Sequence, residues 1–159
     1  MDKLSLDGLN FETICLEVDK KILTITLNRP EKKNAMNNVM MDELNYALAF
    51  AKQEDEIRVV VIAANGDIFC AGADLSRSES VSNVPKLPSA DDISLSLRHL
   101  YKPVICKIQG SVLAGALLIV TNSTHAIAVK DATFSAPEIH RGLWPFMVMA
   151  GLFRVMPKR

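Results

Sequence analysis

Residues 68–75 have the sequence Ile-Phe-Cys-Ala-Gly-Ala-Asp-Leu, in which a strand ends in a loop of small residues. The segment follows residues 59–63, a continuous run of apolar and mostly β-branched side chains that is typical of a strand buried on both faces. Small residues at 71–73 allow another group to approach the main chain closely. The sequence therefore predicts an accessible stretch of main chain where a buried strand ends.

Residues 109–116, Gln-Gly-Ser-Val-Leu-Ala-Gly-Ala, have the same construction. They follow a strand predicted at 104–108, and they begin an apolar helix predicted from about residue 113 to residue 122. Main-chain amides at the start of a helix favour negative charge. Two such amides directed at one point would form an oxyanion hole, although either segment alone is more often a close-packed turn.

Strands and helices alternate along the rest of the sequence. Further strands are predicted at residues 11–19, 21–27 and 126–129, and helices at about 38–54, with Asn37 or Asn38 as the N-cap, and at 93–101. Residues 76–92 are rich in serine, contain two prolines and are predicted to form a mobile loop. The alternation favours an α/β domain with parallel strands, and its rhythm suggests repeated ββα units.

Composition narrows the possible functions. The 159 residues fit one domain, and 18 basic and 18 acidic residues give no electrostatic footprint for nucleic acid. The longest strongly apolar stretch, residues 111–120, is too short to span a bilayer, and residues 1–10 lack the features of a signal peptide. The three cysteines have no metal-ligand spacing, so we expect buried thiols, no metal and a cytoplasmic protein.

Four motifs occur in an order that resembles the crotonase superfamily, the enoyl-CoA hydratase/isomerase family. The motifs are Asn28-Arg29-Pro30 with Asn34-Ala35-Met36, residues 69–75, Gly110 with residues 114–116, and Phe134 with Pro137-Glu138, Gly142-Leu143 and Pro145. The resemblance implies an α/β fold of the ClpP/crotonase type, a spiral of repeated ββα units. Residues 1–159 would form its N-terminal core domain, without the C-terminal helices of the family. Such a chain would be a truncated product, a fragment or a naturally short paralogue.

The resemblance also implies a set of site residues. The amides of Ala73 and Gly115 would form the oxyanion hole for an acyl-CoA thioester, and Glu138 would move a proton at the α or γ carbon. Coenzyme A would be part of the substrate, with no permanently bound cofactor. Its implied contacts are Lys32, Lys33, Ala35, Ala71, Gly72, Ala73, Asp74 and Leu75. For the two lysines, a solvated turn is an equally good interpretation.

The sequence departs from the family pattern at Leu118. Two-glutamate hydratases carry their other acid at this position, three residues after the oxyanion glycine, and leucine can neither activate water nor transfer a proton. Shifting a double bond requires only one carboxylate, which favours an isomerase. A one-glutamate hydratase, a thioester hydrolase and a catalytically weak acyl-CoA-binding or assembly subunit remain alternatives.

The last part of the sequence is very apolar. Trp144, Phe146, Met147, Met149, Leu152 and Phe153 would line an acyl tunnel, pack in the core or contact a neighbouring subunit. Exposure of residues 144–156 would give an apolar patch that soluble monomers rarely tolerate. We therefore expect either self-association through this segment or loss of residues from a longer parent. The resemblance implies a homo-oligomer, a trimer or hexamer in the full-length form of the family.

Overall fold

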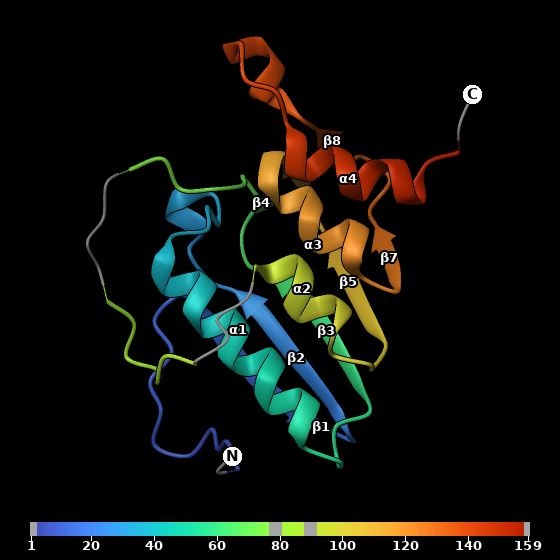
Figure 1. The fold of residues 1–159 in the computed structure, drawn as a ribbon. Helices are drawn as coiled ribbons and strands as arrows, with labels where there is room; N and C mark the ends of the chain where they lie inside the picture. The colour runs from blue at the N-terminus through green and yellow to red at the C-terminus, as the bar shows by residue number, and fades with distance from the viewer. Residues whose placement is uncertain (1–2, 77–80, 88–91, 158–159) are drawn as a thin grey trace.

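A five-stranded sheet forms the centre of the molecule (Figure 1). The computed structural model describes residues 3–76, 81–87 and 92–157. The strands are β1 (Ile14–Asp19), β2 (Ile22–Leu27), β3 (Val59–Ala64), β5 (Val104–Ile108) and β7 (His125–Ala128), in the order β1-β2-β3-β5-β7. Only β1 is antiparallel to its neighbour within this sheet. Lys20 and Lys21 join β1 to β2 with φ of 45° and 70°, as type I′ hairpin turns require.

A second, smaller sheet contains β4 (Ile68–Cys70), β6 (Ser111–Leu113) and β8 (Phe134–Ser135), all parallel and in the order β4-β6-β8. Each of its strands follows one strand of the large sheet, because β4 comes after β3, β6 after β5 and β8 after β7. A helix follows each pair. After β1 and β2, which both belong to the large sheet, each ββα unit adds one strand to both sheets, which confirms the predicted α/β class and its rhythm.

Helices α1 (Asn38–Gln53), α2 (Ile93–Arg98) and α3 (Leu117–Asn122) lie side by side along the sheet, and α4 (Phe146–Val155) crosses one end of this row beside α3 (Figure 1). The chain also forms the 3-10 turns η1 (Pro30–Lys32), η2 (Ala114–Ala116) and η3 (Pro137–Arg141). Asn37 caps α1, its side chain accepting a hydrogen bond from the Met40 amide at 2.9 Å. The core between helices and sheets includes the fully buried Leu23, Leu44, Leu48, Ile62 and Phe69.

Several element boundaries differ from those predicted from the sequence. The helix expected from residue 113 is a strand up to Leu113, a 3-10 turn, and an α-helix only from Leu117. The cause is the ladder between β6 and its neighbours, which the apolar periodicity does not reveal, and the positive φ of Ala114, 52°, which reorients the chain. The first strand begins at Ile14, not at residue 11, and the strand predicted at residues 126–129 is β7, which spans His125–Ala128. Helix α2 ends at Arg98, before Tyr101 with its φ of 57°.

Two further predictions concern cysteines and the serine-rich segment. Cys70 and Cys106 are buried as expected, but Cys15 is exposed, so the prediction of three buried thiols was wrong for Cys15. In the segment predicted to be a loop, residues 81–87 have no helix or strand, with Val84 buried. Residues 77–80 and 88–91 of the same segment lie outside the described residues.

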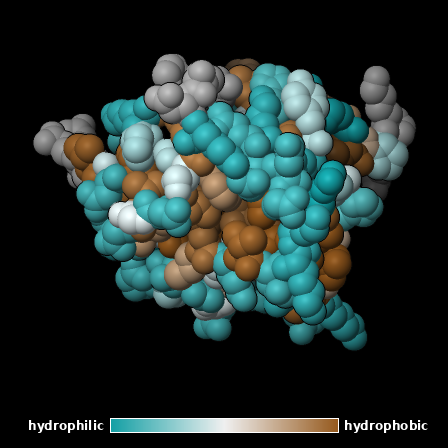
Figure 2. Space-filling model, turned by 90° about the horizontal axis from the view of Figure 1, so that it is seen from below, coloured by the Kyte–Doolittle hydropathy of each residue, from teal (hydrophilic) through white to brown (hydrophobic). Residues whose placement is uncertain are grey.

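Exposed apolar side chains concentrate in the C-terminal part of the chain. They are Ile127, Val129, Phe134, Ile139, Leu143, Trp144, Phe146, Met147, Phe153, Val155 and Met156. The predicted exposure of residues 144–156 is thus confirmed for most of its large side chains, whereas Met149 and Leu152 are half-buried. Seen from below the view of Figure 1, another face shows apolar patches among mostly hydrophilic side chains (Figure 2).

Candidate functional site

The three segments predicted to carry the chemistry follow neighbouring strands of the small sheet at the same edge. Ala73 lies just beyond the end of β4, Gly115 just beyond β6, and Glu138 just beyond β8. Because these strands are parallel neighbours, with Cys70 opposite Val112 and Leu113 opposite Ser135, their carboxyl ends lie together. Ligands of parallel α/β sheets commonly bind at this edge. The topology therefore assembles a candidate site from residues that are far apart in the sequence.

Gly72 allows the first two of these segments to touch. Its φ is +90°, and a Cβ at this position would lie 2.7 Å from Ala114 Cβ, 2.9 Å from Leu113 O and 3.0 Å from Gly115 N. Neither this conformation nor this space is available to a residue with a side chain. The main chains before Ala73 and around Gly115 are therefore in direct contact.

The Ala73 amide faces away from the backbone that supports it. Met36 and Ala73 form an isolated parallel bridge, in which Met36 N donates to Gly72 O (2.8 Å) and Asp74 N donates to Met36 O (2.9 Å). Since successive residues of a strand alternate in direction, the N–H of Ala73 points to the opposite side. Within residues 3–76, 81–87 and 92–157 this N–H has no hydrogen-bond acceptor, and Ala73 is exposed.

Gly115 lies beside that amide. The position that a Cβ on Gly115 would occupy is 3.7 Å from Ala73 N and 3.7 Å from Met36 Cε. Gly115 is in the first turn of η2, where main-chain amides have no acceptor within the helix. The structure thus brings the main chains of Ala73 and Gly115 close together, and their action as a joint oxyanion hole stays a prediction.

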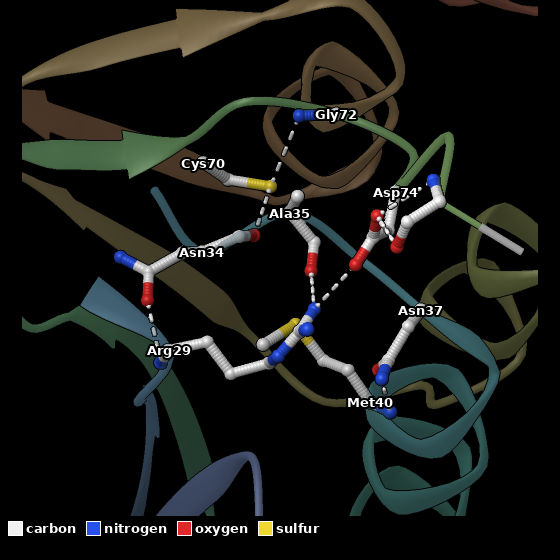
Figure 3. Close-up of polar contacts among 9 residues, drawn as sticks. Arg29, Asn34, Ala35, Asn37, Met40, Cys70, Gly72 and Asp74 are labelled. Atoms are coloured by element: carbon white, nitrogen blue, oxygen red, sulfur yellow. Dashed lines mark hydrogen bonds and ion pairs between the residues drawn. The ribbon is translucent and has the colours of Figure 1, made fainter. Parts of the chain in front are cut away.

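A polar network holds the loop of Ala73 against the segment of residues 29–36 (Figure 3). Arg29 Nη1 donates to Ala35 O at 2.5 Å and to Asp74 Oδ2 at 3.0 Å. Asn34, in a left-handed conformation with φ of 52°, accepts from Arg29 N and donates to Ile68 O. From the sequence, the segment of residues 29–34 was expected only to lie near the phosphates of coenzyme A, and no individual role was predicted for Arg29 or Asn34. No local pattern indicated that Arg29 would pair with Asp74, 45 positions away.

Two groups of the network have shifted pKa values. Hydrogen bonds from the Ser76 side chain and backbone, and then from Arg29, lower the pKa of Asp74 to about 2. Burial raises the pKa of the Cys70 thiol to about 11, and its Sγ lies 3.0 Å from Asn34 O. Asp74 is therefore ionised and Cys70 is a neutral thiol near neutral pH, so Cys70 has no nucleophilic character.

The residues predicted to contact coenzyme A fall into two groups. Lys32, Lys33 and Leu75 are exposed, as is Ala73. The others hold the loop in place: Ala71 N donates to Lys33 O, Ala35 O accepts from Arg29, Gly72 O accepts from Met36, and the Asp74 carboxylate is engaged by Arg29 and Ser76. Contact of any of them with coenzyme A stays a prediction.

Glu138 is half-buried in η3. Its Oε2 is buried and has no hydrogen-bond partner among the residues that the structure describes. A carboxylate oxygen without a partner has unused capacity to accept a proton or a hydrogen bond. Leu118, which takes the place of a second acid, packs against the core from α3.

No group of three or more His, Cys, Asp or Glu side chains in the described part of the chain is arranged to hold a metal ion. No helix among the same residues is long and apolar enough to cross a membrane.

The sequence profile of the enoyl-CoA hydratase/isomerase family matches residues 17–159. A trans-2-decenoyl-[acyl-carrier-protein] isomerase from Streptococcus mutans is 31% identical over 144 residues, covering 86% of this chain and 55% of the relative. A probable enoyl-CoA hydratase from Mycobacterium bovis is 35% identical over 133 residues, covering 77% and 47%. The crystal structure of an enoyl-CoA hydratase/isomerase from Mycobacterium paratuberculosis superposes with a TM-score of 0.80 at 31% identity, covering 94% of this chain and 60% of that one. The chain spans about half the length of the curated relatives it matches.

Proposed function

The chain belongs to the enoyl-CoA hydratase/isomerase family, and from this premise we propose that its site binds an acyl-CoA thioester and stabilises an enolate-like intermediate. The observation that carries the proposal is the Ala73 amide, which has no acceptor among the described residues and lies next to Gly115. The names of the relatives share a thioester but differ in its carrier, coenzyme A or acyl-carrier protein. The exposed Lys32 and Lys33 support coenzyme A, because they offer two cations to its phosphates.

The two amides act on the thioester carbonyl. When a proton leaves the α carbon, negative charge develops on the thioester oxygen, and donors already in place stabilise it without reorganisation. Each such donor contributes on the order of 3 kcal/mol to lowering the barrier. Small residues around Ala73 and Gly115 suit this role, because the groups that act belong to the main chain.

Glu138 is proposed as the group that moves the proton. Its carboxylate takes a proton from the α carbon of a β,γ-unsaturated thioester and returns it to the γ carbon, which gives the α,β-unsaturated isomer with no net gain or loss of protons. The buried Oε2 without a partner among the described residues supports this role. Hydration would in addition require activation of a water molecule, for which Leu118 provides no group. Double-bond isomerisation is therefore favoured over hydration.

A β,γ-unsaturated acyl-CoA such as but-3-enoyl-CoA tests the reaction, since its conjugated product has a distinct ultraviolet absorbance. Glu138→Gln should lower turnover about 10²–10⁴-fold, the usual contribution of general acid–base catalysis, while affinity for butyryl-CoA stays the same. Glu17→Gln, an exposed residue on β1, is the matched control and should leave turnover unchanged. Equal turnover of the Glu138→Gln variant and the wild type would remove Glu138 from the mechanism.

A second candidate function is acyl-CoA binding without turnover. It is favoured by the exposure of Ala73, because donors that face water stabilise a developing charge less than donors in a dry site. Measurable binding of butyryl-CoA, with no isomerisation, hydration or hydrolysis of unsaturated acyl-CoA thioesters, would support this candidate against the first.

A further inference from the structure

We propose that Arg29 is a positioning residue that fixes the direction of the Ala73 amide through its contacts with Asp74 and Ala35. This inference rests on the proposed function, since it concerns a donor of the proposed oxyanion hole. Arg29 contacts the residue before Met36 and the residue after Ala73, the two members of the isolated bridge, in the network of Figure 3.

One guanidinium nitrogen binds both strands of the bridge. Arg29 Nη1 contacts the carbonyl of Ala35, which precedes Met36, and the carboxylate of Asp74, which follows Ala73. The Arg29 and Asp74 side chains are only 14% and 10% exposed, so water competes weakly for this ion pair. The peptide between Gly72 and Asp74 is therefore held from the Met36 backbone and from Arg29 together.

Asp74 is also held on its other oxygen. Its Oδ1 accepts from the Ser76 amide at 3.0 Å and from the Ser76 hydroxyl at 2.6 Å, while Oδ2 accepts from Arg29. With both oxygens engaged, the chain after Ala73 cannot swing without breaking bonds to a charged group. Fixing a donor before the ligand arrives is what makes an oxyanion hole effective.

Arg29 is itself anchored by its backbone. Its amide donates to Asn34 Oδ1 at 2.8 Å, and its carbonyl accepts from Lys32 N at 3.0 Å and Asn34 N at 2.9 Å. The guanidinium therefore extends from a short rigid turn. A lysine would retain the charge but not the planar arrangement of donors, so Arg29→Lys should rescue the function only in part.

A positioning role differs from a direct effect of charge on the bound oxyanion. If Arg29 acted through its positive charge, then removing it would weaken carbonyl polarisation, whereas removing the negative charge of Asp74 would strengthen it. A positioning role predicts that Arg29→Gln and Asp74→Asn both weaken it. The pair of variants thus separates the two explanations.

Nuclear magnetic resonance of the ¹⁵N-labelled chain provides a readout that needs no ligand. Arg29→Gln and Asp74→Asn should each accelerate hydrogen exchange of the main-chain amide at position 74 about 10- to 100-fold, the range expected when a hydrogen bond to a charged group is lost, and lower the order parameter of the Ala73 N–H. Arg29→Lys should lie between these variants and the wild type. Glu56→Gln, which removes an exposed ion pair with Lys21, is the control and should change neither quantity.

The second readout is the ¹³C shift of the carbonyl of bound, labelled butyryl-CoA. In the wild type, a downfield shift of this carbonyl on binding reports polarisation of the thioester. Absence of the shift would count against the proposed function, whereas the hydrogen-exchange test would still decide whether Arg29 positions the Ala73 amide. Smaller shifts in Arg29→Gln and in Asp74→Asn are expected. The inference is overturned if either folded variant keeps the wild-type exchange and order at residues 73 and 74, or if the two variants change the shift in opposite directions. Should Arg29→Gln fail to fold, Arg29→Lys and Asp74→Asn carry the same comparison.

Discussion

Substitution of Gly72 by alanine perturbs the contact on which the candidate site depends. An alanine with φ near +90° costs roughly 1–2 kcal/mol in conformational energy. Its Cβ would also lie 2.7 Å from Ala114 Cβ and 2.9 Å from Leu113 O, and such overpacking typically costs about 1–3 kcal/mol. The expected loss in free energy of unfolding is therefore about 2–5 kcal/mol, a large part of the stability of a domain.

Denaturant unfolding followed by circular dichroism measures this loss, and Gly142→Ala is the matched control. Gly142 also has a positive φ, +70°, but a Cβ there would meet nothing within 4 Å. This variant should lose only the conformational part, about 1–2 kcal/mol. The difference between the two variants isolates the contact between Gly72 and residues 113–115. Equal destabilisation by the two substitutions would refute the reasoning that this contact is close-packed.

Two further predictions concern stability. The pKa of Asp74 is lowered to about 2 in the folded chain, so ionised Asp74 contributes to the free energy of unfolding above its unfolded pKa of ~3.9, and this contribution is lost as pH falls toward 2. The free energy of unfolding, measured as a function of pH, should show this loss in the wild type and not in Asp74→Asn. An identical pH dependence in the two proteins would contradict the prediction. At the α3–α4 contact, a Cβ on Gly151 would lie 2.3 Å from Thr121 Oγ1, so Gly151→Ala should destabilise by about 1–3 kcal/mol. Thr121→Val should be neutral or stabilising, because that hydroxyl is buried without a partner among the described residues; a thermal melt in which Thr121→Val loses as much as Gly151→Ala would be the opposite result.

Local sequence patterns correctly predicted those helices and strands that are determined by residues close together in the sequence. The β-branched run of β3 and the apolar spacing of α1, with Asn37 as its cap, gave strand and helix close to their observed bounds. The small residues of 71–73 and 114–116 indicated accessible main chain. These features depend on neighbours in sequence, which is why periodicity and turn chemistry were sufficient for them.

Local sequence patterns could not predict the contacts between segments that are distant in sequence. The stretch from residue 111 is apolar enough for a helix, and only its pairing with β4 and β8 makes its first part a strand. The Arg29–Asp74 ion pair joins residues 45 positions apart, and neither residue indicates its partner locally. The exposure of Cys15 has the same origin, because the fold leaves its face of β1 uncovered, and the residue type alone does not predict this.

The most direct test of the central claim is a titration of the ¹⁵N-labelled chain with butyryl-CoA, a saturated thioester that cannot be isomerised. If the thioester oxygen is held by two main-chain donors, the amide protons of Ala73 and Gly115 should show the largest downfield shifts, since both acquire a hydrogen bond on binding. Binding that leaves these two amides unshifted, or no binding at all, would contradict the claim.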